Sequence, residues 1–113
     1  MIIGTHTMIF SKDADKDRAF FRDVLKFPYV DNGGNWLIFD LPKTEMGIHP
    51  SDSDYHEIYF LCEDIDDFIK EMNKHNIETS NRRDEPWGKI VDVMLPGGST
   101  LMIYESLHKR PKA

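Results

Sequence analysis

The distribution of apolar and polar residues divides this chain into two similar halves. Each half contains an apolar stretch that begins at a histidine, residues 6–10 in the first and residues 56–60 in the second. A pair of acidic residues follows each stretch, Asp13 with Asp15 and Asp64 with Asp66. An apolar run that leads to acidic helix-capping residues predicts a strand followed by a helix. The pattern therefore predicts one structural unit that occurs twice.

The spacing between the halves decides which residues are equivalent. The acidic pairs agree at an offset of 51 residues, whereas the two histidines lie 50 residues apart. At the offset of 51, Glu57 rather than His56 is the equivalent of His6. Because side chains alternate along a strand, Glu57 and Tyr59 would lie on one face and Phe60 on the other, under a helix.

In the first half, residues 2–49, we expect a strand, a helix and three further strands. The first strand covers residues 2–11, and the helix begins after Asp13 or Asp15 and ends at Pro28. The apolar side of the helix consists of Ala14, Phe20, Phe21, Val24 and Leu25. Tyr29-Val30 as a short extended segment, a turn over residues 31–34, and strands over residues 36–41 and 45–49 complete this half.

The second half, residues 55–105, follows a polar linker over residues 50–54 and repeats this order. After a strand over residues 55–62, a helix capped by Asp64 has apolar residues at helical spacing, namely Ile65, Phe68, Ile69 and Met72. We then expect a short strand from Ile77, a charged loop over residues 82–86, a strand over residues 87–95, and a last strand that ends at Glu105.

The composition is that of one folded domain. The chain has 113 residues, of which 40% are hydrophobic and 12% aromatic, enough for a modest core without disulfides. The formal net charge of −6 argues against general binding of nucleic acids, which requires a cationic surface. The basic segment over residues 108–112 is too short to reverse this balance, and we interpret it as a solvated tail.

Cysteine content and hydropathy indicate the compartment. The single cysteine, Cys62, cannot form an internal disulfide, and the strand register places it on the helix side, where we expect a buried and unreactive thiol. No apolar run approaches ~18 residues, and the start lacks a cationic leader with an apolar stretch. We therefore expect a cytoplasmic protein without a membrane span.

Together, the doubled order of elements and two local motifs resemble the vicinal oxygen chelate superfamily, which includes glyoxalase I, extradiol dioxygenases and bleomycin resistance proteins. The motifs are Glu85-Pro86-Trp87-Gly88 before the seventh expected strand and Leu95-Pro96-Gly97-Gly98 before the last. The resemblance covers residues 3–105. It implies a single α+β domain over residues 1–113, in which two tandem βαβββ modules form curled mixed sheets around a cavity, with the helices outside.

The resemblance also implies a divalent metal, such as Zn, Ni, Mn or Fe, bound at up to four positions. Carried over to this chain, the positions are His6, Gly47, Glu57 and Met102. Gly47 has no side chain, and the thioether of Met102 is a poor ligand for hard divalent ions. A replacement set would be His6, His49 and Glu57, with His56 in place of Glu57 if the register differs. We therefore expect a degenerate metal site and no tightly bound cofactor.

Two functions are compatible with these residues. In the first, the protein binds a small planar or cationic molecule in its cavity, with Tyr59, Trp87, Tyr104 and Met102 as candidate binding residues. In the alternative, it is a metal-dependent lyase, isomerase or dioxygenase acting on a vicinal-oxygen substrate, and the carboxylate of Glu57 transfers protons. For either function the resemblance implies a homodimer.

Overall fold

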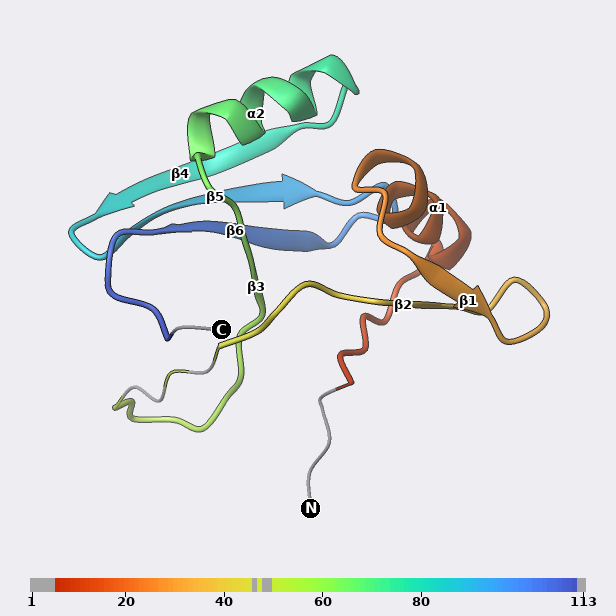
Figure 1. Cartoon of the computed structure of the whole chain (residues 1–113), viewed down its shortest axis with the longest axis horizontal. Coiled ribbons are helices and arrows are strands. Elements are labelled where there is room, and N and C mark those ends of the chain that lie inside the picture. Colours follow the sequence, from red (N-terminus) through yellow and green to blue (C-terminus); the bar gives the residue numbers. More distant parts are fainter. Residues whose placement is uncertain (1–5, 46, 48–49, 112–113) are drawn as a thin grey trace.

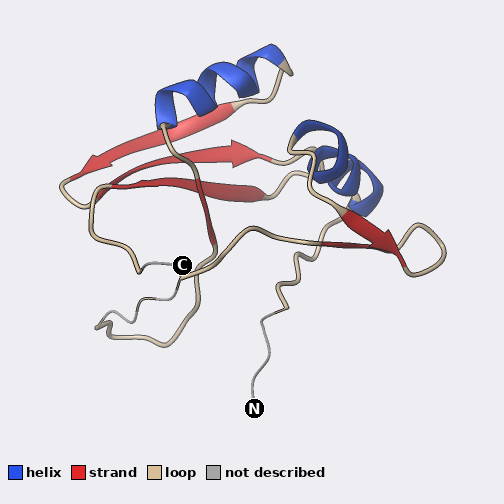
Figure 2. Ribbon diagram, in the orientation of Figure 1, coloured by secondary structure: helices blue, strands red, loops and turns tan. Residues whose placement is uncertain are grey.

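The computed structural model describes residues 6–45, 47 and 50–111, and shows a small α+β arrangement (Figures 1 and 2). Its first helical segment is α1 (Ala14–Ala19), continued by a π-helical segment, η1 (Phe20–Val24), and its second helix is α2 (Ile65–Lys74). The strands are β1 (Tyr29–Asp31), β2 (Leu37–Phe39), β3 (Tyr59–Leu61), β4 (Thr79–Glu85), β5 (Gly88–Met94) and β6 (Thr100–Ser106). None of the helices in these residues is long and apolar enough to cross a membrane.

Four strands of the second half form one sheet in the order β3-β6-β5-β4. The outer strand β3 runs parallel to β6, whereas β6, β5 and β4 are joined by antiparallel pairing. The strands β1 and β2 form a separate antiparallel pair. In the second half the elements follow the predicted order of strand, helix and three strands. In the first half the described residues contain a helical segment followed by two strands.

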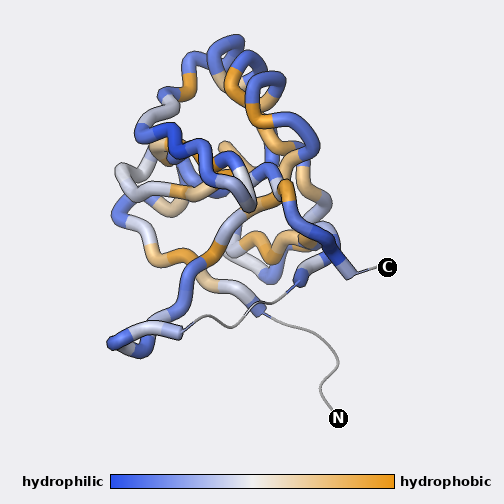
Figure 3. Tube along the Cα trace, turned by 90° about the vertical axis from the view of Figure 1, so that its left-hand side faces the viewer, coloured by the Kyte–Doolittle hydropathy of each residue, from blue (hydrophilic) through white to orange (hydrophobic). Residues whose placement is uncertain are grey.

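The hydrophobic core lies between the four-stranded sheet and the helices. On α2, Ile65 and Met72 are fully buried, and Phe68 and Ile69 pack against the same core, as the helical spacing predicts. Each such burial stabilises the fold by about 1.5–3 kcal/mol. Phe20 and Phe21 of the first helical segment join this core. Figure 3 shows that short hydrophobic stretches alternate with hydrophilic ones along the chain.

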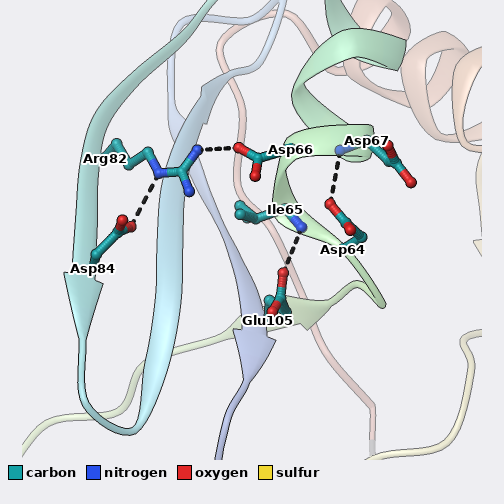
Figure 4. A network of polar contacts seen from close by, with 7 residues as sticks. All are labelled: Asp64, Ile65, Asp66, Asp67, Arg82, Asp84 and Glu105. Atoms are coloured by element: carbon teal, nitrogen blue, oxygen red, sulfur yellow. Dashed lines mark hydrogen bonds and ion pairs between the residues drawn. The ribbon is translucent and has the colours of Figure 1, made fainter.

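A polar network fixes the start of α2 over the sheet (Figure 4). The side chain of Asp64 accepts a hydrogen bond from Asp67 N at 3.0 Å, so the predicted cap is confirmed. Glu105 of β6 accepts a second bond, from Ile65 N at 2.8 Å. These two carboxylates satisfy amides at the helix start that have no partner within the helix. Arg82 of β4 pairs with Asp66 of α2.

The first helical segment begins and ends at specific local signals. Asp13 rather than Asp15 caps it, accepting a hydrogen bond from Lys16 N at 3.3 Å. The segment widens at its end, where Leu25 N donates to Phe20 O at 3.1 Å, five residues back. The helical segment ends at Val24, four residues before the predicted end at Pro28, because the left-handed Lys26, with φ 59°, already turns the chain.

The predicted charged loop over residues 82–86 is wrong, because most of it belongs to β4. This strand lies at the edge of the sheet, where charged side chains remain in solvent and also discourage pairing with another chain. Pairing with β5 satisfies one side of its backbone, and a bulge between Ser80 and Arg83 accommodates Asn81 in a left-handed conformation. A charged composition therefore does not exclude a strand at this position.

The predicted strand over residues 2–11 is not present in its described part. Residues 6–11 have no strand pairing, and Phe10 is 87% exposed, although Ile9 packs against the core. The expected strands 36–41 and 55–62 shorten to β2 and β3. Alternation of side chains can indicate a strand, but a strand forms only where its backbone groups pair with a neighbour. Of the expected strand 45–49, residues 46, 48 and 49 lie outside the described residues.

Candidate functional site

The face of the four-stranded sheet opposite α2 carries the candidate binding residues. In the parallel pairing, Tyr59 of β3 lies opposite Met102 of β6, and Leu61 lies opposite Tyr104. The intervening Phe60 and Ile103 belong to the core on the other face. The sequence register is therefore correct for β3, since Tyr59 and Phe60 lie on opposite faces.

Three aromatic residues from different parts of the second half meet on this face. The ring of Tyr104 lies 5.7 Å from that of Tyr59 and 5.8 Å from that of Trp87, measured between centroids. The hydroxyl of Tyr104 also donates a hydrogen bond to Trp87 O at 3.0 Å. Tyr104 is only 8% exposed, whereas Trp87 is 48% exposed. We refer to Tyr59, Trp87 and Tyr104 as the aromatic cluster.

A glycine makes room for the central ring of this cluster. Gly88 begins β5 directly after Trp87, and a Cβ atom placed on it would lie 2.3 Å from Cε1 of Tyr104. This distance is far below a normal contact, so a side chain at this position is incompatible with the observed ring position. The packing of the Tyr104 ring therefore explains why the Glu85-Pro86-Trp87-Gly88 motif ends in glycine.

A carboxylate adjoins the aromatic cluster. The hydroxyl of Tyr59 donates a short hydrogen bond to Oε2 of Glu57, two residues earlier. Burial of the phenol, followed by the hydrogen bond and the charge of Glu57, raises the pKa of Tyr59 to about 12. Tyr59 therefore remains a hydrogen-bond donor at neutral pH and orients the Glu57 carboxylate.

A second pair of charges lies on the same face of the sheet. Arg83 of β4 contacts Oδ1 of Asp92 on β5 at 3.1 Å, and Asn81 donates to Oδ2 of the same carboxylate at 3.0 Å. The positive charge of Arg83 acts on Tyr59 in the direction opposite to Glu57. The carboxylate of Asp92 is thus engaged by two neighbours, whereas that of Glu57 receives only the Tyr59 bond among the described residues.

The candidate metal ligands are not brought together in the described part of the chain. His6 and His56 are exposed, and neither forms a hydrogen bond or ion pair with another described residue. No group of three His, Cys, Asp or Glu side chains is arranged to hold a metal within residues 6–45, 47 and 50–111. His49 lies outside these residues. The candidate set of His6, His49 and Glu57 therefore remains a prediction.

An open hollow of about 490 Å³ lies at the other end of β3. It is lined by Pro42, Lys43, Leu61, Cys62, Glu63, Ser106 and Arg110. None of the aromatic cluster contributes to its lining, so this hollow is not the cavity that the sequence predicts. The expected cavity with Tyr59, Trp87, Tyr104 and Met102 as its binding residues remains a prediction.

Residues 108–111 are exposed, as expected of a solvated segment, but two of their side chains make contacts that the sequence did not predict. The ring of His108 lies 5.7 Å from that of Tyr104, and Arg110 forms an ion pair with Glu45 of the first half. These contacts were missed because the segment is short, basic and without periodicity. The sequence features that could have indicated them are His108, which can contact an aromatic ring, and Arg110, which can pair with a carboxylate.

The sequence matches no protein-family model, and a search of curated proteins finds no match. Solved structures are similar over nearly the whole chain. Lactoylglutathione lyase from Agrobacterium tumefaciens has a TM-score of 0.69 at 17% identity, covering 91% of this chain and 92% of that one. TnmS3, an antibiotic binding protein from Streptomyces sp. CB03234, has a TM-score of 0.68 at 17% identity, covering 94% and 98%.

A third solved structure is also similar over nearly the whole chain. A member of the glyoxalase/bleomycin resistance protein/dioxygenase superfamily from Sphaerobacter thermophilus DSM 20745 has a TM-score of 0.69 at 20% identity, covering 93% of this chain and 98% of that one. Similarity at this level of identity concerns the fold, since one fold supports many activities. The resemblance inferred from the sequence is thereby confirmed, and the chain has the vicinal oxygen chelate fold shared by these proteins.

Proposed function

We propose that the protein binds a small planar organic molecule, preferably a cation, at the aromatic cluster. The observation that carries this proposal is the contact of three rings beside a carboxylate, Glu57, that is oriented by Tyr59. Stacking between planar rings favours an aromatic ligand, and the ring faces together with the carboxylate favour positive charge. The net charge of −6 acts in the same direction.

Exposure within the cluster supports this assignment. Trp87 is 48% exposed and Tyr59 is 37% exposed, so both rings have surface that a ligand can cover. Met102 lies opposite Tyr59 in the sheet and would supply an adaptable apolar floor. One of the structures with the same fold, TnmS3, is an antibiotic binding protein, which supports the proposal of a small-molecule ligand.

A second candidate is the enzyme activity anticipated from the sequence. The Glu57 carboxylate, paired with the Tyr59 hydroxyl, is the group we would assign to proton transfer, and one similar structure is a lactoylglutathione lyase. A metal-dependent lyase, isomerase or dioxygenase also requires metal ligands. Because the described side chains do not supply such a set, binding without catalysis is the function we place first.

Titration with two planar dyes of opposite charge tests the binding proposal. We expect the cationic dye proflavine to bind and to quench Trp87 fluorescence, and an anionic naphthalene sulfonate to bind more weakly. Trp87→Leu should weaken proflavine binding three- to tenfold, since one aromatic contact contributes about 0.5–1.5 kcal/mol. Trp36→Leu is the matched control, because Trp36 is 49% exposed and forms no ring contact in the described structure.

Substitution of the carboxylate separates charge from shape. Glu57→Gln preserves the size of the side chain, so it should weaken proflavine binding and leave a neutral planar analogue unaffected. If Glu57→Gln weakened the binding of proflavine and of the neutral analogue equally, Glu57 would act only by positioning Tyr59. If Trp36→Leu and Trp87→Leu had the same effect, the aromatic cluster would not be the binding site.

We also propose a homodimer. The strand β3 has one unpaired edge among the described strands, and Val30 of β1 and Phe10 are exposed apolar residues that a partner would cover. Light scattering at micromolar concentration should give twice the chain mass of 13.2 kDa. A monomer mass would reject the dimer, and Val30→Asp tests whether β1 lies in the interface.

We further propose that the chain consists of two tandem modules that share one cavity. Two βαβββ modules related by a pseudo-twofold axis would bring His6 close to Glu57, as equivalent positions. A spin label on His6→Cys, in a Cys62→Ser background, should broaden the amide signals of Glu57 and Tyr59 in NMR spectra. Unchanged signals at both positions would argue against a shared cavity.

A further inference from the structure

The chain does not leave the molecule at the end of β6 but turns back across it (Figure 1). Leu107 N donates a hydrogen bond to Trp87 O at 3.0 Å, which attaches this segment to the turn between β4 and β5. Ser106 Oγ donates to His108 O at 3.1 Å and fixes the following turn. We call residues 107–110 the C-terminal strap.

The strap places one ring on the aromatic cluster. The His108 ring is tilted by 32° relative to that of Tyr104, with the two centroids 5.7 Å apart. Tyr104 also contacts Tyr59 and Trp87, and with three ring neighbours it is 8% exposed. A ligand can therefore stack on Tyr104 only if one of these neighbours moves.

Of the three neighbours, His108 is the one outside the sheet and its turns, and its ring nitrogen Nδ1 lies 2.7 Å from Lys109 O within the strap itself. Tyr59 is held by the backbone pairing of β3 with β6, and Trp87 lies in the tight turn before β5. His108 is exposed and belongs to a segment outside the sheet. Displacement of His108 thus disturbs no strand pairing.

The end of the strap is fastened to the first half of the chain. Arg110 forms an ion pair with Glu45, and the side chains are 47% and 22% exposed. Ion pairs with this degree of exposure contribute little to stability and are weakened by salt. This ion pair therefore presents only a small barrier to opening of the strap.

We propose that the strap is a reversible cover of the binding site, in which His108 occupies the stacking position on Tyr104 until a planar ligand displaces it. This inference rests on the proposed function, because it concerns access to the same cluster. If only a fraction of the molecules is open, the apparent dissociation constant is the intrinsic one divided by that fraction. A strap that is open about one tenth of the time would weaken binding about tenfold.

The contact itself can be tested without a ligand. The ring current of Tyr104 should shift the ring-proton NMR signals of His108 away from their values in an unfolded chain. Arg110→Ala and Glu45→Gln should move these signals towards the unfolded values, whereas Lys109→Ala should not. Unshifted His108 signals in the unmodified chain would overturn the proposal.

Competition is tested by proflavine titration of the full chain and three variants. His108→Ala should tighten binding about five- to tenfold, and Arg110→Ala should tighten it less. Lys109→Ala is the matched control for Arg110→Ala, since each variant removes one positive charge from the same segment. Lys109→Ala leaves the ion pair of Arg110 with Glu45 intact, so we expect it to tighten binding less than Arg110→Ala.

Each pattern of affinities has a distinct meaning. Equal affinities in the unmodified chain and His108→Ala would overturn the cover but leave the proposed function intact. Weaker binding by His108→Ala would also overturn it, because His108 would then be part of the binding surface. No binding by any variant would overturn both proposals.

Discussion

The carboxylate of Asp17 and the backbone amide of Gly97 join the first helical segment to the turn before the last strand. Gly97 N donates to Asp17 Oδ1 at 2.6 Å across 80 residues of sequence, and Asp17 is 4% exposed. A Cβ atom on Gly97 would lie 2.4 Å from Ser11 Oγ and 2.6 Å from Asp17 Oδ2. The glycine in the Leu95-Pro96-Gly97-Gly98 motif is therefore required by a contact between the two halves.

Changes at this contact should destabilise the protein. Gly97→Ala should lower the free energy of unfolding by about 1–3 kcal/mol through steric overlap. Asp17→Ala should have a similar effect, because it leaves a partly buried amide without a partner. Urea denaturation measures both, and Gly47→Ala is the control, since a Cβ atom there meets nothing within 4 Å. Equal stability of Gly97→Ala and Gly47→Ala would contradict the contact.

The packing of Tyr104 on Gly88 gives a second stability prediction. Gly88→Ala should force the Tyr104 ring out of the cluster and cost about 1–3 kcal/mol. In a Tyr104→Leu background the same change should cost less, because the ring that it meets at 2.3 Å is absent. A double-mutant cycle by urea denaturation checks this, and additive effects would count against the contact.

The phenol of Tyr59 should titrate late. Its pKa of about 12 in the folded protein lies above the ordinary value of 10.0, so its contribution to stability is complete below pH 10.0 and is lost as the pH rises towards 12. Tyrosinate absorbance should show a late phase that Tyr59→Phe removes. Glu57→Gln should move this phase only part of the way back, because burial is the larger cause.

Cys62 should be unreactive at neutral pH. Burial, followed by the charges of Glu105 and Asp64, raises the pKa of its thiol to about 11, so little thiolate is present. We expect alkylation by iodoacetamide to be slow in the native protein and fast after denaturation in urea. Rapid alkylation of native protein at neutral pH would show that the thiol is accessible and ionised.

Metal content separates the two functions proposed for this chain. Because Gly47 and Met102 occupy two of the four implied ligand positions, we expect protein purified without added metal to contain well under one equivalent of Ni, Zn, Mn or Fe. Elemental analysis measures this directly. One tightly held metal per chain, lost in both His6→Ala and Glu57→Gln, would favour the enzyme.

Local signals in the sequence were sufficient for the helices and for part of the sheet. The cap at Asp64 and the spacing of Ile65 and Met72 determined α2 and its buried side, because helix hydrogen bonds and caps join residues close in sequence. Alternation likewise determined that Tyr59 and Phe60 lie on opposite faces. The doubled order and its turn motifs were specific enough to indicate the fold.

Only the tertiary structure decided which segments are neighbours. Strand pairing made a charged segment into β4 and left residues 6–11 without a partner, although their alternation is that of a strand. It also brought Trp87 to Tyr104, and the strap brought His108 to the same ring. These contacts depend on sheet order and on the path of the chain after β6, and no local pattern of side chains encodes either of them.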